Sequence, residues 1–391
     1  MTAAPSPARV YAAGICALIL CLGVARFAYT PMIAHMQDQT GLSEGLAGWL
    51  AGWNYLGYLS GVLVVTRLKD MVLKDRLYRF GLVLAVLTTA MMGLGTDPVL
   101  WGASRYLAGL AAAAGLMLSS GLILNWLIRH DHKPELGIHF TGVGAGIVFG
   151  AVVVEGAARF IAWDGQWWLL TAAGALLAIP AWAWMPRPRS GKPLTDAHRE
   201  SGREPCRSWL WLLQGAYALA GFGYVVQATF LVLITEEAPG MEGKGGIMWL
   251  VAGLAAAPAT LLWDRIARRV GYLSALQWCF VVQIVSLLIP VFWGGLLPAI
   301  AASVLAGGTF IGIVSLVLTM VGRLFPAHPA SIMAKLTLGY SVAQIVGPVL
   351  AGEMAEASGT FAGGLLMAVA LMSMGWVGLL LMRRVERRAE V

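Results

Sequence analysis

The stretch that decides the fold reads CLGVARFAYTP and runs from Cys21 to Pro31. It lies inside an apolar segment from about Val10 to Met36, which as a helix is long enough to cross the roughly 30 Å hydrocarbon layer of a bilayer. Arg26 falls near the middle of this segment, where a guanidinium costs about 2.5–3.5 kcal/mol. We therefore expect Arg26 to face a wet cavity or the protein interior, with Tyr29 and Thr30 one turn further on.

The composition extends this prediction to the whole chain. Of its 391 residues, 59% are hydrophobic and only 12% are charged, whereas soluble domains carry roughly 25% charged residues. This balance predicts a polytopic membrane protein. The net charge of +7 does not indicate a nucleic-acid partner, because the basic residues are spread over short loops. No spacing of His, Cys, Asp or Glu predicts a metal or a cofactor.

Twelve apolar segments follow one another along the chain. They are Val10–Met36, Ser43–Thr66, Leu77–Gly95, Val99–Ile128, Gly137–Phe160, Gln166–Met185, Trp209–Thr235, Gly246–Trp263, Leu273–Trp293, Leu296–Val321, Ile332–Gly352 and Phe361–Met382. The long polar stretch after the sixth segment predicts a linker. We therefore expect an all-helical membrane protein with a bundle in 1–185, a cytoplasmic linker in 186–208 and a second bundle in 209–391.

The positions of Lys and Arg predict the orientation. When the segments alternate across the membrane, 23 of the 27 basic residues fall on the side of the N-terminus. Arg159 and Lys244 fall on the other side, and Arg26 and Arg105 lie within the membrane. Because short cytoplasmic loops carry the excess of Lys and Arg, both termini are expected to be cytoplasmic.

The two halves share a nearly constant offset, which predicts a duplication of six helices. The pairs that lie 198 residues apart are Gly23 with Gly221, 107–109 with 305–307, 147–148 with 345–346, and Glu155 with Glu353. Repeats of this kind place a binding site at their interface, near the midplane of the membrane.

Two motifs resemble those of the major facilitator superfamily. The run RYLAGLAAA from Arg105 resembles the fourth-helix motif of that superfamily, and GVGAGIVFG from Gly142 resembles the glycine-rich fifth-helix motif of its antiporters, with Ile147 where a Pro is usual. The loop motif after the second helix is poorly kept. More narrowly, RFAYTP from Arg26, the stretches 48–58 and 221–231, and their spacing resemble the YbfB/YjiJ-type bacterial branch.

The resemblance implies a secondary active transporter that works by alternating access between two pseudo-symmetric six-helix bundles in a bacterial inner membrane. Arg26 favours a small organic cargo that is anionic or polar, drug-like solutes included. The glycine-rich fifth helix favours export by proton antiport, with protons and the lipid bilayer as partners, and we expect a monomer. An uptake carrier for a small carboxylate and a non-transporting receptor or scaffold of the same fold remain as alternatives. An intramembrane enzyme is not expected, because the acids, bases and metal ligands do not converge.

Polar and aromatic residues on matching helices of the two halves are the candidate cargo site. They are Arg26, Tyr29, Asn54, Tyr55, Tyr58, Tyr224, Gln227, Tyr340 and Gln344, with Gln283 as a weaker member. Asn54, Tyr55 and Tyr58 share one helix face by their i, i+3 and i, i+4 spacing. The alternative is a structural role: hydrogen bonds between helices for the set, and an arginine bonded to carbonyls at a helix break for Arg26.

A second set is predicted to serve coupling or conformational change. Arg105 is assigned by the family motif, against the alternative of an arginine that reaches the headgroups. Glu155 is the acid nearest to the membrane interior in its half, against the alternative of an interfacial pair with Arg159. Gly142, Gly146 and Gly150 recur every four residues and let the fifth helix approach a neighbour closely.

Overall fold

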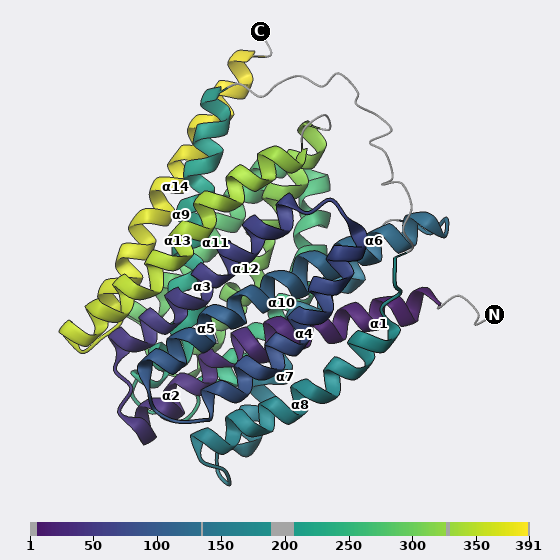
Figure 1. Ribbon diagram of the computed structural model, residues 1–391. Coiled ribbons are helices and arrows are strands. Elements are labelled where there is room, and N and C mark those ends of the chain that lie inside the picture. Colours follow the sequence, from purple (N-terminus) through teal and green to yellow (C-terminus); the bar gives the residue numbers. More distant parts are fainter. Residues whose placement is uncertain (1–5, 134–135, 189–206, 326–328, 390–391) are drawn as a thin grey trace. The chain divides into compact units, whose positions relative to one another are not determined.

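The computed structural model describes residues 6–133, 136–188, 207–325 and 329–389. Within these ranges the protein is entirely helical, as predicted (Figure 1). The chain divides into two compact units, one of residues 1–43 with 53–193 and one of residues 44–52 with 194–391. Most of the predicted linker, residues 189–206, lies outside the described residues.

The first unit begins with a long helical stretch that changes its winding twice. Its elements, α3 included although that helix begins in the second unit, are α1 Pro7–Leu18, the π-helix η1 Ile19–Phe27, α2 Tyr29–Thr40, α3 Glu44–Arg67, α4 Met71–Met92, α5 Pro98–Ala113, the π-helix η2 Ala114–Leu118, α6 Ser119–Arg129, α7 Gly137–Ala157 and α8 Trp163–Trp184. With α1–η1–α2 and α5–η2–α6 each counted as one span, these elements give the six predicted helices.

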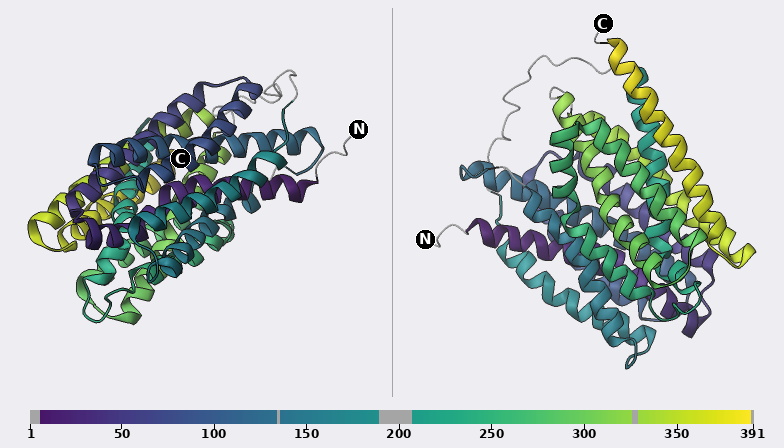
Figure 2. Two further views of the ribbon diagram at one scale, coloured as in Figure 1. Left: turned by 60° about the horizontal axis from the view of Figure 1, so that its bottom comes forward. Right: turned by 180° about the vertical axis from the view of Figure 1, so that it is seen from behind.

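The second unit adds six uninterrupted helices. They are α9 Arg207–Glu236, α10 Gly245–Val270, α11 Tyr272–Phe292, α12 Leu296–Leu324, α13 Pro329–Ser358 and α14 Ala362–Ala389. Nine of the helical stretches in the described part of the chain are long and apolar enough to cross a bilayer by length and composition alone. Helices α9, α13 and α14 pack against one another along their length (Figure 2).

Several helices begin or end at residues that suit a helix terminus. Asp70 caps α4 by accepting hydrogen bonds from the backbone N–H groups of Val72 and Leu73. Asp97 caps α5 in the same way, with Pro98 at the first helical position. Gly41 ends α2 in the left-handed conformation, with φ of 73°. These local signals explain why the loops between the first helices are short.

The first nine residues of α3, residues 44–52, belong to the second unit, whereas the sequence places them in the first bundle. Within the second unit Glu356 accepts a hydrogen bond from the backbone N–H of Gly45 at 2.8 Å. Glu353 accepts one from Trp49 Nε1 at 2.9 Å. These contacts tie the start of α3 to the end of α13.

A further acid, Glu237, fixes the start of α14. Its carboxylate accepts hydrogen bonds from Phe361 N at 3.1 Å and from Thr360 Oγ1 at 3.2 Å. Both contacts lie within the second unit, in the loop after α9 and just before α14. A carboxylate at a helix N-terminus also interacts favourably with the helix dipole.

Corresponding helices pack in the same pairs in each unit. The pairs α4–α5, α1–α8 and η1–α7 of the first unit match α11–α12, α9–α14 and α9–α13 of the second. A Cβ placed on Gly109 would meet Asn54 O, and one on Gly307 would meet Ala252 O. Each residue of the second contact lies 198 residues after its counterpart in the first. The duplication predicted from the sequence therefore extends to individual backbone contacts.

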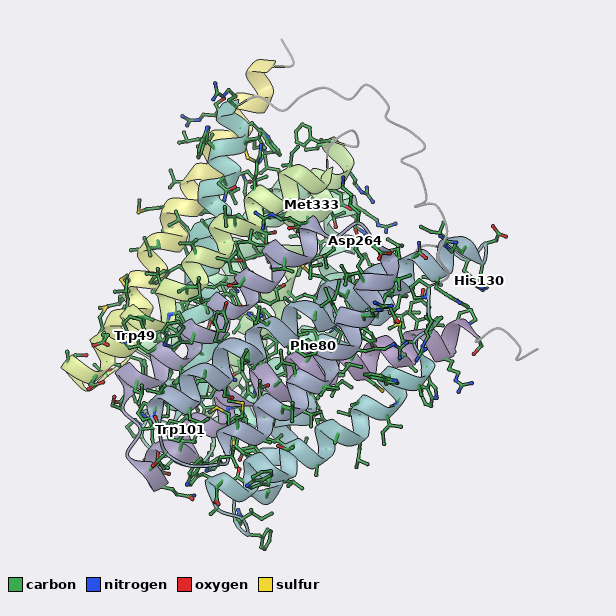
Figure 3. The ribbon with its side chains drawn as sticks, viewed as in Figure 1. Trp49, Phe80, Trp101, His130, Asp264 and Met333 are labelled. Atoms are coloured by element: carbon green, nitrogen blue, oxygen red, sulfur yellow. The ribbon has the colours of Figure 1, made fainter. Side chains whose placement is uncertain are left out.

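Tryptophans close the first unit where α4, α5 and α8 meet. Trp101, near the beginning of α5, donates from Nε1 to Met92 O at 3.2 Å (Figure 3). Its ring meets that of Trp163 edge-on, with centroids 5.7 Å apart. This packing holds the ends of three helices together at one end of the unit.

Candidate functional site

Arg26 lies in the π-helical turn η1, on the stretch from which the sequence argument starts. Its side chain is only 6% exposed, as its position in the sequence predicts. Its guanidinium carbon lies 4.5 Å from the ring centroids of both Tyr55 and Tyr58 on α3, and 5.3 Å from that of Phe27. Cation–π contacts of this kind are strongest where the groups are desolvated. The tyrosines therefore share one face of α3 and cover the cation.

Arg105 caps the end of the same π-helix from α5. It donates from Nη1 to Ala25 O at 3.0 Å and from Nη2 to Arg26 O at 3.1 Å, and its guanidinium carbon lies 4.3 Å from the Tyr29 ring. It is 3% exposed, so it does not reach the headgroups. A helix break frees backbone carbonyls, and a forked cation is well suited to bind two of them at once.

The local sequence explains why carbonyls are free at this point. The N–H of Ala28 bonds to Gly23 O at 2.8 Å, which is the five-residue step of a π-turn. Three residues later Pro31 lacks the N–H that would otherwise bond to Phe27 O. Arg105 is thus an arginine bonded to carbonyls at a helix break, which is the structural role that the sequence offers as the alternative for Arg26.

Asn54 ties α3 to the same point. Its Nδ2 donates to Arg105 O at 2.9 Å, and its side chain is 1% exposed. Its Oδ1 is buried and accepts no hydrogen bond from the described residues. The first unit therefore brings together all five candidates predicted for it, with Arg105 added from the coupling set.

In the second unit, stacked aromatic rings surround Tyr224. The Tyr340 ring lies 4.3 Å from that of Tyr217 and 6.0 Å from that of Tyr224, and Tyr224 lies 5.3 Å from Phe310. The planes of successive rings differ by 17°, 7° and 10°. Gln344 donates from Nε2 to the Tyr224 hydroxyl at 2.8 Å. The structure thus places Tyr224, Tyr340 and Gln344 in one cluster.

Gln227 lies in a separate network of amides and hydroxyls. Its Oε1 accepts hydrogen bonds from Gln283 Nε2 at 3.0 Å and from Ser286 Oγ at 2.9 Å, and its Nε2 donates to Ser286 O at 3.2 Å. Thr309 Oγ1 donates to Gln283 Oε1. Gln227 also lines a cavity of about 30 Å³ with residues of α9, α11 and α12, which is room for about one water molecule. The network joins helices and reaches a small cavity.

The predicted glycine seam is present in the first unit. A Cβ on Gly142 would lie 3.0 Å from Leu18 Cβ, and one on Gly146 would lie 2.9 Å from Gly23 Cα. A Cβ on Gly150 would lie 3.4 Å from Gly23 O. Helix α7 therefore approaches α1 and η1 at backbone distance over three turns. Glu155 is half-buried near the end of the same helix.

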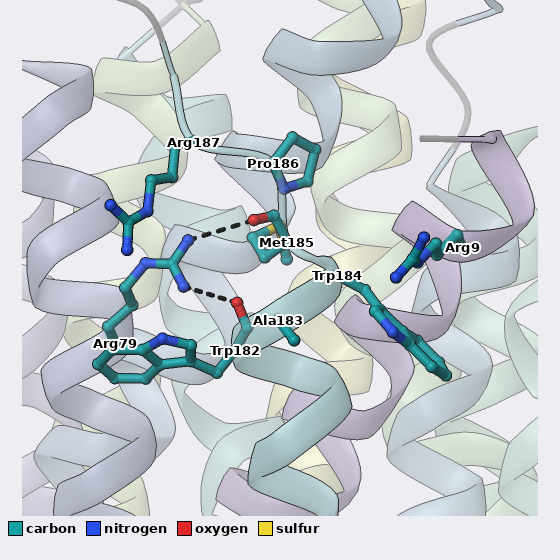
Figure 4. Close-up of a pocket in the computed structure, with 8 residues that line it drawn as sticks. All are labelled: Arg9, Arg79, Trp182, Ala183, Trp184, Met185, Pro186 and Arg187. Atoms are coloured by element: carbon teal, nitrogen blue, oxygen red, sulfur yellow. Dashed lines mark hydrogen bonds between the residues drawn. The ribbon is translucent and has the colours of Figure 1, made fainter. Parts of the chain in front are cut away.

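A basic pocket of about 420 Å³ lies where α1, α4 and α8 meet in the first unit (Figure 4). Arg79 donates to Trp182 O at 2.6 Å and to Met185 O at 3.2 Å, and it pairs with Asp75 at 3.1 Å. The exposed Arg9 lies over the Trp184 ring at 5.5 Å. Cations beside tryptophans suit the headgroup region of a membrane. The sequence predicts no site at these residues.

Known structures identify the fold. Nucleoside transporter NupG superposes with a TM-score of 0.76 at 12% identity, covering 96% of this chain and 98% of that chain. A bacterial homolog of the human lysosomal transporter Spinster, described as inward-facing and occupied, gives 0.70 at 16% identity, covering 97% and 98%. The fold of this chain, with its two repeated helical units, is therefore the one seen in these two structures.

The sequence comparison gives the family. The family model described as "Uncharacterised MFS-type transporter YbfB" matches residues 18–380, and the chain belongs to this family. Two relatives come from Bacillus subtilis (strain 168): the uncharacterized MFS-type transporter YtbD, 21% identical over 91% of this chain and 92% of its own length, and YceJ, 23% identical over 66% and 67%. Family and fold imply a transporter rather than an enzyme.

Sequence reasoning missed several residues of these clusters. Ser286, Thr309, Phe310 and Tyr217 complete the networks of the second unit, and His139 lies buried in the first. Ser286 lies 198 residues after Thr88, and both residues lie where α11–α12 and α4–α5 pack. The repeat offset that pointed to Gln227 could therefore have pointed to Ser286 as well.

Proposed function

We propose that this protein is a secondary active transporter that moves a small organic solute with an anionic or strongly polar group. It works by alternating access in the bacterial inner membrane, as a monomer with both termini cytoplasmic, and exports its cargo in exchange for protons. The observation that carries the proposal is the Arg26 guanidinium, held 4.5 Å from two tyrosine rings in a π-helical turn of a transporter fold.

The π-turn supports a binding role for Arg26. Single π-turns inside helices are frequent at functional sites, because they change the direction of side chains that a regular helix would space evenly. Arg105 satisfies the carbonyls at the end of this turn, so the Arg26 side chain is not needed for that task. Its planar guanidinium is suited to a carboxylate or phosphate, which it can bind through two parallel hydrogen bonds.

The rings of Tyr55 and Tyr58 limit the access of a cargo to Arg26. Because both rings lie against the guanidinium, a cargo anion reaches Arg26 only as these side chains turn aside. In the second unit, Gln344 and the ring cluster of Tyr224 and Tyr340 supply polar and flat apolar surfaces. We assign both sets to cargo binding, each within its own unit.

The glycine seam and the coupling residues complete the proposal. Helix α7 meets α1 and η1 through Gly142, Gly146 and Gly150, without side chains that interlock. Because small residues line this contact, α7 can move relative to α1 and η1 without releasing interlocked side chains. We assign this seam to the conformational change, with Arg105 and Glu155 as further candidate coupling residues.

The proposal is tested by ligand binding and by flux. Purified protein is screened by thermal shift against small carboxylates, phosphorylated metabolites and anionic drugs, and each hit is then followed as a radiolabelled solute in proteoliposomes with an imposed pH gradient. In Arg26→Ala the solute concentration that gives half of the maximal thermal shift, and the one that gives half of the maximal flux, should both rise at least tenfold, as expected for a lost charged hydrogen bond of about 1.5–3 kcal/mol.

Arg323→Ala is the matched control. Arg323 also lies over a tyrosine ring, 4.8 Å from Tyr272, but it is exposed at the end of α12. Its removal should leave binding and flux unchanged. Binding without flux would favour the receptor alternative, and flux driven inward by the gradient would favour the uptake carrier. Normal binding and transport by Arg26→Ala would refute the assignment of the site.

A further inference from the structure

A buried histidine in the first unit is not used by the proposed cargo site. His139 lies near the beginning of α7 and has no exposed surface. Its ring packs against Gly14 of α1 on one side, and its Nε2 faces Ser119 and Ser120 at the start of α6 on the other. The residue therefore lies between three helices, one turn before Gly142 of the glycine seam.

The hydrogen bonds around His139 determine which ring nitrogen carries the proton. Ser119 Oγ donates to Gly115 O, and Ser120 Oγ donates to Leu116 O at 2.6 Å. A hydroxyl has one hydrogen, so both serine oxygens present lone pairs to the ring. Nε2 lies 3.2 Å from Ser119 Oγ and 3.1 Å from Ser120 Oγ. Nε2 must therefore be the N–H donor, and Nδ1 carries the lone pair.

Nδ1 is a buried base without a hydrogen-bond partner among the described residues. It lies over Gly14, where a Cβ would be 2.5 Å away. The titratable groups on the helices packed against it are Arg9, Tyr11 and Cys16 on α1 and Arg129 at the end of α6, and none forms a hydrogen bond or ion pair with the ring in the described structure. On α7 itself, Glu155 lies 16 residues further on, about 24 Å along the helix.

Protonation of Nδ1 is incompatible with this packing. An imidazolium has two N–H donors, and the second would point at Gly14 with no acceptor. Burying an unpaired charge of this kind is costly, so a proton on Nδ1 favours separation of α1 from α7 and entry of water. Among the described residues the buried acid, Asp75, is already paired with Arg79. Within the described residues, His139 is thus the buried side chain whose nitrogen has a free lone pair to accept a proton.

We propose that Nδ1 of His139 is the proton-binding site of this transporter. The inference rests on the proposed proton-coupled function and identifies its coupling residue. With the α1–α7 seam closed, Nδ1 is unprotonated. When the seam opens, Nδ1 takes one proton from water and the ring gains one positive charge, with no other bond made or broken. Closure expels that proton. This opening takes place along the glycines of α7 that recur every four residues from Gly142.

Distances between α1 and α7 test this coupling without any cargo. Spin labels are placed at Ala8→Cys and Ile138→Cys, both exposed, in a chain whose native cysteines are replaced, and distances are measured in nanodiscs from pH 8 to pH 5. We expect a longer distance to gain population as the pH falls. The ratio of the two populations should change by at most about tenfold per pH unit, the limit for one linked proton.

His139→Gln should abolish this pH dependence while leaving the distance at pH 8 unchanged. Its amide Nε2 still donates to the serines, but it cannot bind a proton. His132→Gln, at an exposed histidine in the loop before α7, is the matched control and should respond to pH as the parent chain does. An unchanged pH response in His139→Gln, or an equal loss of the response in His132→Gln, would overturn the proposal.

The tautomer provides an independent test on the unmutated protein. Nitrogen NMR of histidine-labelled protein at pH 8, with the His139 signal assigned from its loss in His139→Gln, should show a protonated Nε2 and a bare Nδ1. A protonated Nδ1 at that pH would overturn the assignment. Neither measurement needs a transported solute, so a failure here is distinguishable from a failure of the cargo site at Arg26.

Discussion

Removal of Arg105 tests whether a cation holds the π-helical turn on which the candidate site depends. In Arg105→Met the side chain keeps most of its length and loses its donors. Two hydrogen bonds disappear, to Ala25 O and Arg26 O at 3.0 and 3.1 Å, together with the contact to the Tyr29 ring. The two carbonyls then remain inside the protein at the end of η1, next to Arg26 itself.

The magnitude follows from these contacts. Two hydrogen bonds from a charged donor are worth about 3–6 kcal/mol together. The variant recovers part of the cost of burying a charge, which is several kcal/mol. Since the freed carbonyls have no replacement donor on α5, we expect a net loss of about 2–4 kcal/mol in the free energy of unfolding. Arg105→Lys should lose roughly half as much, because an ammonium keeps the charge but lacks the planar fork that reaches two carbonyls.

Reversible unfolding in mixed micelles, followed by tryptophan fluorescence, measures this loss. Arg67→Met is the matched control, because Arg67 also donates to a carbonyl, Leu63 O at 3.1 Å, but is exposed. The control should change the free energy of unfolding by less than about 0.5 kcal/mol. If Arg105→Met is as stable as this control, the capping role of Arg105 and the account of the π-turn built on it are wrong.

Two further predictions concern a glycine and a loop carboxyl. Gly23→Ala should lower the free energy of unfolding by about 1–3 kcal/mol, because its Cβ would lie 2.5 Å from a backbone atom of α7, whereas Gly156→Ala, with open space around it, should be neutral or stabilising in the same unfolding assay. Partial burial raises the pKa of Glu237 above its usual value, against hydrogen bonds that lower it, so its contribution to stability declines as the pH rises through about 4.5. In thermal melts the stability of Glu237→Gln should not show this decline. Hydrogen bonds to backbone N–H groups lower the pKa of Glu242, so its contribution to stability increases as the pH rises, and Glu242→Gln should lose that increase. An unaltered pH profile in Glu237→Gln would contradict the prediction for the loop carboxyl, and a fully stable Gly23→Ala would contradict the close packing of η1 against α7.

The helices and their pairing could be predicted because they depend on signals that accumulate along the chain. Apolar length gives the spans, and the offset of 198 residues gives the correspondence between the halves. The contact of Gly109 with Asn54 O and that of Gly307 with Ala252 O then follow from one duplicated backbone. The assignment of 44–52 to the second unit could not be predicted, because it depends on contacts of Gly45 and Trp49 with α13.

The candidate site was predictable only in part. Helical spacing placed Tyr55 and Tyr58 on one face, and the structure shows both against Arg26. The π-turns were not predicted, because a shift from four-residue to five-residue hydrogen bonds leaves no distinct trace in apolar residues. Since η1 changes the direction of each later side chain, the capping role of Arg105 was invisible as well. A buried histidine such as His139 carries no pattern of its own.

The two units share their helix pairing but differ in the side chains that join the helices. In the first unit Ser104 donates to Thr88 O at 2.7 Å. In the second unit Ser286 shares its one hydrogen between Gln227 Oε1 at 2.9 Å and Ala302 O at 3.0 Å, so the same pair of positions is joined with the donor on the other helix. The position of Arg105 is occupied by Ser303 in the second unit, and that unit bonds its helices through amides and hydroxyls instead. In the described part of the second unit the helices contain no π-helical turn whose carbonyls a cation would have to bind. The asymmetry places the buried guanidinium groups of Arg26 and Arg105 in the first unit, which is where the proposed anionic cargo should bind.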